Sequence, residues 1–312
     1  MIFNHFIRIK DIRTTPTGAW VVRPKKHKDF ASNPLEGVIK ILEEKDLTHS
    51  VIGVEKKRMP ITIYEQLKKK LPNAQFYDAE EILWRLREIK SDEEISKLEK
   101  AVKITERGIE AMLNHVREGV SDIDILRQFK LTVIEEGGDV SHVNFGIGGR
   151  GGWVFASPHD HKVERGDIIR MDVGAMYMGW RADLCRIKVF GKPSEKLTKL
   201  YKALLQAQRN GIELIKPGVK LSEVYRTITE NVRKAGYADY LRGMVGHSIG
   251  LETEEEPFIT SATDRVFEPN MVFCIEVPWY EPGWGGVSVE DTIVVTKDSY
   301  KELSTIDRDL VL

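Results

Sequence analysis

Two apolar, strand-like stretches of this chain each carry a pair of acidic residues, and this combination constrains the fold more than any other feature. Asp172 and Asp183 lie in the first stretch, and Glu276 and Glu290 lie in the second. Runs this rich in Val, Ile, Met and Phe predict buried strands. Because a buried carboxylate without a partner is unfavourable, each pair requires a shared proton, an ion pair or a bound cation.

The first stretch is predicted to fold into an antiparallel hairpin. A two-residue loop at Tyr177 and Met178 would place Asp172 directly opposite Asp183. This loop lacks an Asn-Gly signal, so the register is a hypothesis that follows from the spacing alone.

The second stretch has a stronger turn signal, because Pro and Gly occur between residues 281 and 285. Pairing Tyr280 with Gly286 places Glu276 opposite Glu290. Directly opposed side chains have Cβ atoms about 4.5–5.5 Å apart, so like charges repel there. Two such pairs in one domain favour a bound cation, and the ions of two-metal sites stand about 3.5–4 Å apart, a span that opposed carboxylates can bridge.

His247 is the candidate nitrogen ligand. Glycines precede and follow it in Gly246-His247-Ser-Ile-Gly, which lets the backbone approach closely. A carboxylate-rich site with one imidazole suits manganese, iron, cobalt or zinc. The five candidate metal ligands are Asp172, Asp183, His247, Glu276 and Glu290.

Ion pairing is the alternative explanation for the carboxylates. Three arginines lie near the first pair in sequence: Arg170, Arg181 and Arg186. Of these, Arg170 shares strand parity with Asp172 and could pair with it. Cys185 and Cys274 each stand two residues from a candidate ligand on the same strand face, where small buried packing residues are favoured over additional ligands.

The region before these stretches predicts a second, smaller domain. Residues 1–88 alternate short apolar strands with helical stretches, which indicates an α/β unit. The strands are expected at residues 20–22 and 50–54, and the helices at residues 35–44, 63–71 and 80–89. Ser91 and Glu94 form a capping box that begins a helix reaching about Val116. The domain boundary is therefore placed between residues 88 and 89, and the second domain covers residues 89–312.

A faint internal repeat occurs in the second domain. Gly108-Ile-Glu-Ala and Gly211-Ile-Glu-Leu each precede a glycine turn and a further helical pattern. Two related halves of about 100 residues, with a cleft between them, would explain the repeat. Chance similarity is the alternative.

Composition excludes several classes of function. The 312 residues include 47 basic and 48 acidic side chains, for a net charge of −1, which argues against a nucleic-acid partner. No run approaches the roughly 20 apolar residues that span a bilayer, and the N-terminus lacks the pattern of a signal peptide. The two cysteines do not form a disulfide framework. A cytoplasmic protein without membrane or nucleic-acid partners is expected.

At the candidate ligands the sequence resembles the pita-bread metallopeptidase family, which includes Xaa-Pro dipeptidase (prolidase), aminopeptidase P, methionine aminopeptidase and creatinase. Asp172-Val-Gly-Ala and Asp183-Leu-Cys-Arg match its two-aspartate motif, and Gly246-His247-Ser-Ile-Gly-Leu-Glu matches its histidine motif. Ile275-Glu276 and Gly285-Gly-Val-Ser-Val-Glu290-Asp match its two glutamate motifs.

The resemblance implies an α+β pita-bread catalytic domain behind a shortened creatinase-like N-terminal domain, in an expected homodimer. It implies two divalent ions (Mn, Co, Fe or Zn) bridged by a water or hydroxide, which cleave an amide bond in a small peptide. Glu276 matches the ligand thought to manage the proton.

Three positions depart from the pattern of the family's peptidases. Phe155 and Glu254 stand where two further histidines are usual, and Ser288 stands where an arginine is usual. A small local shift of the alignment with the family motif would bring His159 or His161 to the position that Phe155 now occupies. We therefore expect Glu254 to take part in catalysis, and Phe155, His159 and Trp279 to contact substrate. A relative that hydrolyses a small cyclic or cationic amide or amidine, and a catalytically inactive binding module, are the alternatives.

Overall fold

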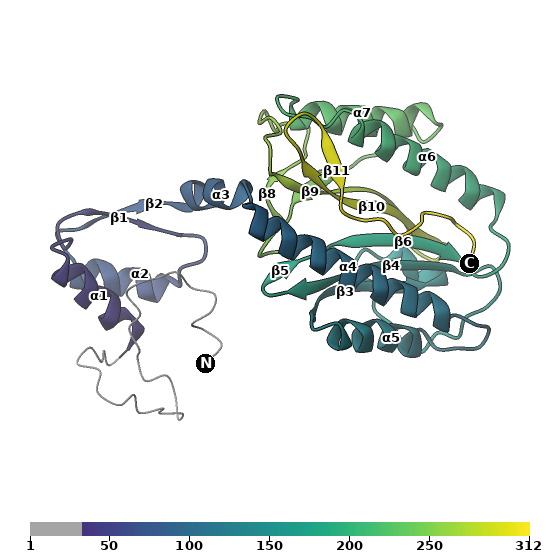
Figure 1. Cartoon of the computed structure of the whole chain (residues 1–312), viewed down its shortest axis with the longest axis horizontal. Helices are drawn as coiled ribbons and strands as arrows, with labels where there is room; N and C mark the ends of the chain where they lie inside the picture. Colours follow the sequence, from purple (N-terminus) through teal and green to yellow (C-terminus); the bar gives the residue numbers. More distant parts are fainter. Residues whose placement is uncertain (1–32) are drawn as a thin grey trace. The chain divides into compact units, whose positions relative to one another are not determined.

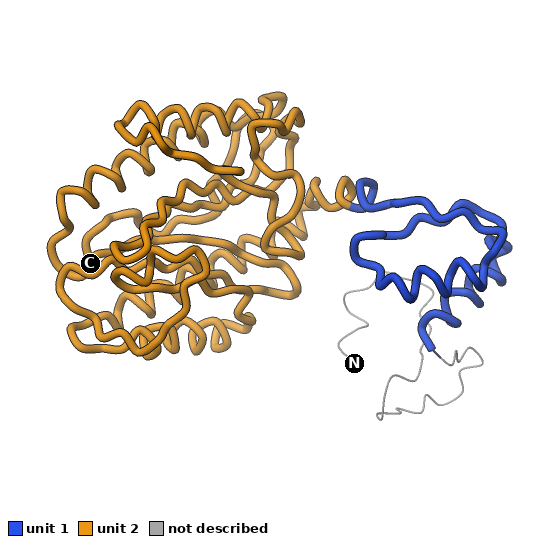
Figure 2. The backbone as a smooth tube through the Cα atoms, turned by 180° about the vertical axis from the view of Figure 1, so that it is seen from behind, with its two compact units in different colours: residues 1–83 blue, residues 84–312 orange. Residues whose placement is uncertain are grey.

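A computed structural model describes residues 33–312 of the chain. The chain divides into two compact units, Met1–Leu83 and Trp84–Leu312 (Figure 2). The sequence placed the boundary slightly later, between residues 88 and 89. The strand expected at residues 20–22 lies outside the described residues.

The described part of the smaller unit is an α/β arrangement, as the sequence predicts. Its two strands pair in parallel, and two helices contribute the core residues Leu35, Ile39, Leu67 and Leu71. These elements are α1 (Pro34–Glu44), β1 (Val51–Val54), α2 (Ile61–Lys70) and β2 (Gln75–Asp78). The predicted helices at residues 35–44 and 63–71 and the predicted strand at residues 50–54 are confirmed to within two residues.

The larger unit contains a nine-stranded antiparallel sheet in the order β3-β4-β6-β10-β9-β7-β8, with β5 against β4 and β11 against β10. The strands are β3 (Asp139–Ile147), β4 (Ile168–Tyr177), β5 (Trp180–Arg181), β6 (Leu184–Val189), β7 (Gly246–Ser248), β8 (Glu255–Phe258), β9 (Val272–Glu281), β10 (Gly285–Val295) and β11 (Tyr300–Glu302). A short 3-10 helix, η2 (Gly148–Gly152), follows β3. The two predicted hairpins supply the centre of this sheet.

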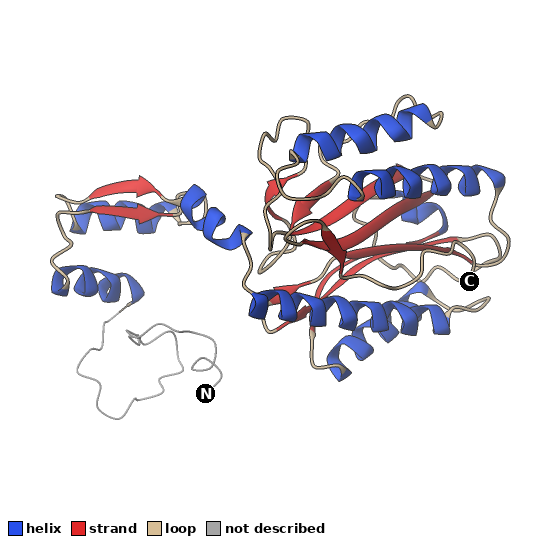
Figure 3. Ribbon diagram, turned by 45° about the horizontal axis from the view of Figure 1, so that its top comes forward, coloured by secondary structure: helices blue, strands red, loops and turns tan. Residues whose placement is uncertain are grey.

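Two helix pairs pack along the two halves of the sheet (Figures 1 and 3). One pair is α4 (Asp92–His115) with α5 (Asp122–Glu135), against β3 and β4. The other is α6 (Glu195–Ile212) with α7 (Leu221–Lys234), and α6 packs against β9 and β10. The chain enters α4 through α3 (Glu80–Glu88) and the predicted capping box, in which Ser91 and Glu94 bond reciprocally.

The repeated glycines explain how each helix pair approaches closely. A Cβ on Gly108 would lie 2.5 Å from the ring of Phe129 in α5, and a Cβ on Gly211 would lie 2.4 Å from Ile228 in α7. Each glycine therefore lets the two helices of its pair pack closely. The two members of the faint sequence repeat occupy equivalent positions in the two helix pairs. No helix among residues 33–312 is long and apolar enough to cross a membrane.

The predicted register of the first hairpin is wrong, and that of the second is confirmed. The first turn is centred on Met178 and Gly179, which have φ angles of 52° and 90°, and not on Tyr177 and Met178. Positive φ at both central residues is the geometry that two-residue hairpin turns favour, and Gly179 supplies it readily. The strands therefore shift by two residues, and Asp172 opposes Cys185 instead of Asp183.

In the second hairpin, Tyr280 pairs with Gly286 and Glu276 pairs with Glu290, as expected. The error in the first hairpin moves Asp183 by two residues along the strand, so it stays on the same face of the sheet as Asp172.

Candidate metal centre

Three carboxylates and a thiol form one row across four neighbouring strands. Asp172 on β4 opposes Cys185 on β6, Cys185 opposes Glu290 on β10, and Glu290 opposes Glu276 on β9. Residues that are directly opposed project to the same face of a sheet. The register alone therefore gathers these four side chains on one surface.

A second row, two residues further along, adds the remaining donors to the same face. His142 on β3 opposes Gly174 on β4, and His247 on β7 opposes Cys274 on β9. Between them lies Asp183, just before β6. A bulge between Val140 and His142 shifts the register of β3, and bulges of this kind re-aim side chains.

Asp183 stands between the two imidazoles. Its Oδ1 lies 3.0 Å from the Nε2 of His142, and its Oδ2 lies 3.8 Å from the Nε2 of His247. The Oδ1 of Asp172 lies 3.4 Å from the same nitrogen of His142. The donor atoms of His142, Asp172 and Asp183 lie within 4.8 Å of one another, as do those of His247, Cys274 and Glu290. A third group of this kind, Asp172, Cys185 and Glu290, shares one carboxylate with each of the other two.

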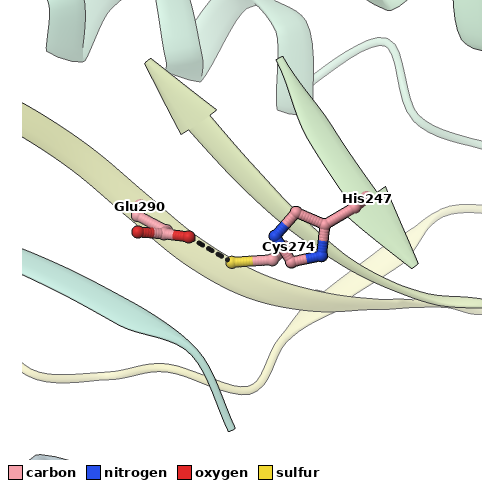
Figure 4. Close-up of side chains that lie close together, drawn as sticks. All are labelled: His247, Cys274 and Glu290. Atoms are coloured by element: carbon pink, nitrogen blue, oxygen red, sulfur yellow. Dashed lines mark hydrogen bonds between the residues drawn. The ribbon is translucent and has the colours of Figure 1, made fainter. Parts of the chain in front are cut away.

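His247 presents one ring nitrogen to the site in a defined state. Its Nδ1 lies 3.1 Å from the carbonyl oxygen of Ser248, which can only accept a hydrogen bond, so Nδ1 carries the proton. The Nε2 lone pair is then free to bind a cation. Figure 4 shows this imidazole beside Cys274, whose thiol donates to the Oε1 of Glu290 over 3.0 Å.

The ion-pair alternative applies to only part of the carboxylate cluster. Arg170 donates to the Oδ2 of Asp172 over 3.1 Å, and a guanidinium nitrogen of Arg242 lies 3.5 Å from Glu276. Among residues 33–312, no lysine or arginine pairs with Asp183 or Glu290. The other two arginines face elsewhere: Arg186 pairs with Asp291, and Arg181 binds Ser141 and the carbonyl of Leu251.

The electrostatics of this face favour a bound cation. Burial raises the pKa of Glu276, against an opposing effect of Arg242. Burial, and then the charges of Asp183 and Asp172, raise the pKa of Glu290 well above its usual value. Burial lowers the pKa of His142, but the same two aspartates outweigh it and raise that pKa to about 10. These pKa shifts all indicate that negative charge is concentrated in a part of the protein with little access to water.

Both thiols pack in the core, and the thiol of Cys274 also donates hydrogen bonds. Cys185 and Cys274 are fully buried, and burial raises the pKa of each thiol well above its usual value. A thiol must lose its proton to bind a metal strongly, so these two are poor ligands beside so many carboxylates. This arrangement agrees with the packing role that the sequence favours.

Phe155 and Glu254, two of the three departures from the family pattern, lie around one pocket of about 520 Å³. It is lined by Phe155, Glu254 and Arg181 together with the cluster residues His142 and Asp183. Glu254 is exposed, and Phe155 is 84% exposed. The pocket therefore connects the candidate metal centre with solvent.

The other candidate substrate residues lie elsewhere. Trp279 lines a neighbouring pocket of about 220 Å³ with Arg242, and its ring packs against Tyr237 and Tyr240. His159 lies 3.5 Å from Asp122 and stacks on the ring of His161, and it lines none of the pockets described for residues 33–312.

Ser288 is buried opposite Pro278. Two guanidinium groups from other positions contact carboxylates of the cluster: Arg170 contacts Asp172, and Arg242 contacts Glu276.

His142 is the residue of this site that the sequence reasoning missed. Strand periodicity predicts which face a side chain takes only when the register is regular, and the bulge at Ser141 breaks it. The sequence does show a histidine on a strand-like segment before the hairpin of Asp172 and Asp183. Nothing in the residues around His142, however, indicates that it lies next to Asp183.

A buried ion cluster supports the strand that carries His247. The ammonium of Lys90, which has no exposed surface, donates to the Oγ of Ser248 over 2.9 Å and lies 3.5 Å from the Oε2 of Glu255. Arg87 also pairs with Glu255. Burial lowers the pKa of Lys90, and Glu255 opposes that shift.

Replacing Glu255 with Gln should destabilise the protein by about 2–4 kcal/mol, because it leaves the ammonium of Lys90 buried without its counter-ion. Urea unfolding followed by circular dichroism measures the change. The neighbouring Glu256 is exposed, and Glu256→Gln is the matched control, expected to stay within about 0.5 kcal/mol of the parent. Equal stabilities for the two variants would contradict the prediction.

The donor set fits divalent metal ions. It combines the three clustered carboxylates of Asp172, Asp183 and Glu290 with imidazole nitrogen, and Glu276 lies directly opposite Glu290. The buried Oδ1 of Asp183 has no hydrogen-bond partner among the described residues. A cation would satisfy that oxygen and offset the unfavourable burial of charge, which is the main cause of the raised pKa values of Glu276 and Glu290.

Comparison with known proteins also supports a metal-binding hydrolase. The chain matches metallopeptidase family M24 over residues 96–297 and the creatinase/prolidase N-terminal domain over residues 15–89. It is 31% identical to the Xaa-Pro dipeptidase of Pyrococcus horikoshii over 264 residues, covering 83% of this chain and 74% of that protein.

Solved structures of similar proteins share the fold. An Xaa-Pro dipeptidase from Bacillus anthracis superposes with a TM-score of 0.85 at 30% identity, covering 91% of this chain and 80% of that one. The prolidase of Pyrococcus furiosus gives 0.80 at 28% identity, covering 89% and 81%. The chain therefore belongs to metallopeptidase family M24 and is a metallohydrolase with the pita-bread fold.

Proposed function

We propose that this enzyme is a dinuclear Xaa-Pro dipeptidase in which five residues hold two divalent ions. These are Asp172, Asp183, His247, Glu276 and Glu290. The observation that carries the proposal is the position of Asp183, whose Oδ1 faces the imidazole of His142 and whose Oδ2 faces that of His247. A carboxylate placed in this way can bridge two ions. The mixture of carboxylates and imidazole suits manganese, cobalt, iron or zinc.

The proposed reaction combines the chemistry of the metal ions with proton transfer by Glu276. Bound ions would supply a Lewis acid for the scissile carbonyl and a more acidic water. Glu276 accepts a proton from the attacking water and passes it to the leaving amine. Its contact with Arg242 helps to hold this carboxylate in place.

The pocket beside the metal centre has a composition that suits a short peptide. Glu254 and Arg181 bring opposite charges to its wall, which fits the free amine and the free carboxylate of a dipeptide. Phe155 offers an exposed apolar ring for a proline side chain. Trp279 belongs to the adjoining pocket and could extend the binding surface. His159 is left out of this assignment because its imidazole contacts Asp122.

The test combines metal content with a substrate panel. Purified protein, loaded with each of the four metals and freed of excess, should retain about two ions per chain by elemental analysis. Xaa-Pro dipeptides should be hydrolysed, and activity should disappear with a chelator and return with metal. Absence of retained metal would contradict the proposal.

A second candidate substrate class rests on Glu254. An acidic residue at a usual histidine position lacks an imidazole donor and favours a cationic group, so small cationic amides and amidines belong in the same panel. Hydrolysis of these compounds, without hydrolysis of dipeptides, would favour this candidate.

The assembly state and the location of the enzyme form part of the same proposal. We expect a homodimer, because Trp153 and Val154 are adjacent exposed apolar side chains, and exposed apolar patches often mark interfaces. Sedimentation equilibrium tests this. The two buried free thiols are consistent with a reducing, cytoplasmic location.

A further inference from the structure

We infer that His142 is a sixth metal ligand, which binds the ion held by Asp172 and Asp183 through its Nε2. The inference rests on the proposed function, since it adds a residue to that metal centre. With His142 the site holds two imidazoles, one on each side of Asp183.

The contacts of His142 resemble those between ligands of one ion more than those of a hydrogen bond. Its Nε2 lies 3.0 Å from Asp183 Oδ1 and 3.4 Å from Asp172 Oδ1, yet neither this nitrogen nor Asp183 Oδ1 has a hydrogen bond of acceptable geometry. Two donors that bind one ion at about 2.1 Å and at right angles stand about 3.0 Å apart. The Nε2 of His142 is therefore spaced from both oxygens as neighbouring ligands of one ion are.

The local backbone directs the imidazole of His142 toward the two aspartates. The bulge between Val140 and His142 sets the direction of the side chain. Gly174, which lies opposite His142, leaves the space that the ring crosses, because a Cβ there would stand 2.6 Å from its Cε1. Both ring nitrogens are buried without hydrogen-bond partners among residues 33–312. A structural histidine in a folded protein usually bonds at least one of them.

A second imidazole changes the chemistry of the centre. Carboxylates and water suit manganese, whereas imidazole favours iron, cobalt and zinc. His142 should therefore shift the preference of one ion away from manganese. The same residue lines the pocket beside Phe155, so the ion it binds faces the substrate side of the centre.

The alternative role for His142 is a protonated counter-ion of the two aspartates, and the two roles predict opposite results. A positive counter-ion competes with the metal, so its removal strengthens metal binding. A ligand contributes to metal binding, so its removal weakens it.

The experiment measures Co²⁺ and Mn²⁺ binding by calorimetry for the parent, His142→Ala and the control His159→Ala, on full-length protein stripped of metal. A metal-ligating group typically contributes at least as much as its supporting residues, about 10–100-fold in affinity. We expect His142→Ala to lose at least that factor for Co²⁺ at one of two sites, and less for Mn²⁺. The visible spectrum of the Co²⁺ form should change, and His159→Ala should match the parent in both measurements.

Unchanged or tighter Co²⁺ binding by His142→Ala, with an unchanged spectrum, would overturn the inference and leave the five-residue centre intact. Failure of the parent itself to bind two ions would instead contradict the proposed function. X-ray absorption of the Co²⁺ form gives an independent count of imidazoles, expected to be two per two ions in the parent and one in His142→Ala.

Discussion

Replacing Asp183 with Asn should remove bound metal and lower kcat/KM for an Xaa-Pro dipeptide by at least about 1000-fold, a loss of transition-state stabilisation of about 4 kcal/mol or more. Asp183 is the only carboxylate of the described cluster whose two oxygens face both imidazoles. An amide has nearly the same shape, but it carries no charge and offers one acceptor oxygen. Elemental analysis and the dipeptide assay measure the two effects.

The stability of the metal-free variant separates a site effect from a folding effect. Asp183→Asn removes one of several mutually repelling charges, and Asp183 is a cause of the raised pKa of Glu290. A carboxylate with a raised folded-state pKa opposes folding above its unfolded pKa. The variant also loses the attraction by which Asp183 raises the pKa of His142, and this loss opposes the gain at Glu290. Metal-free Asp183→Asn should therefore melt close to the temperature of the metal-free parent. Asp139→Asn, at an exposed position on β3, is the matched control and should keep both metal and activity.

Metal retained at two ions per chain by Asp183→Asn would contradict the bridging role of this residue. A melting temperature well below that of the metal-free parent would mean that the loss of activity reflects misfolding and says nothing about the centre.

The two carboxylate hairpins show what could be predicted from the sequence. The register of Glu276 and Glu290 followed from a loop with strong turn residues, and it is confirmed. The register of Asp172 and Asp183 was wrong by two residues, because the weak turn sequence did not reveal that Gly179 occupies the turn. Strand parity survives an error of two residues, so the predicted face was still right.

His142 shows what the sequence could not predict. Its place in the site depends on a β-bulge, on the absence of a side chain at Gly174 and on the pairing of β3 with β4, which is a contact between residues some 30 positions apart. Local pattern and propensity carry no information about such a long-range arrangement. The helices, in contrast, are fixed by local apolar spacing and by caps such as Ser91, and they were predicted to within a few residues.

Replacing Gly174 with Ala should lower the free energy of unfolding by about 4 kcal/mol or more, which is the upper range for a single substitution. A Cβ at this position would lie 1.9 Å from the carbonyl oxygen of Ala182, a backbone atom that cannot move aside without opening the pairing that holds Asp183. The loss should lower Tm by roughly 10 °C for a unit of this size.

Gly243 provides the matched control for this substitution. A Cβ there would meet nothing within 4 Å, so Gly243→Ala should change the free energy of unfolding by less than about 1 kcal/mol. The double variant Gly174→Ala with His142→Ala separates the two clashes at Gly174. It removes the contact with the imidazole but keeps the one with the Ala182 carbonyl, so most of the destabilisation should remain. Full recovery of stability in the double variant would show that the imidazole, and not the backbone of the hairpin, requires glycine at this position.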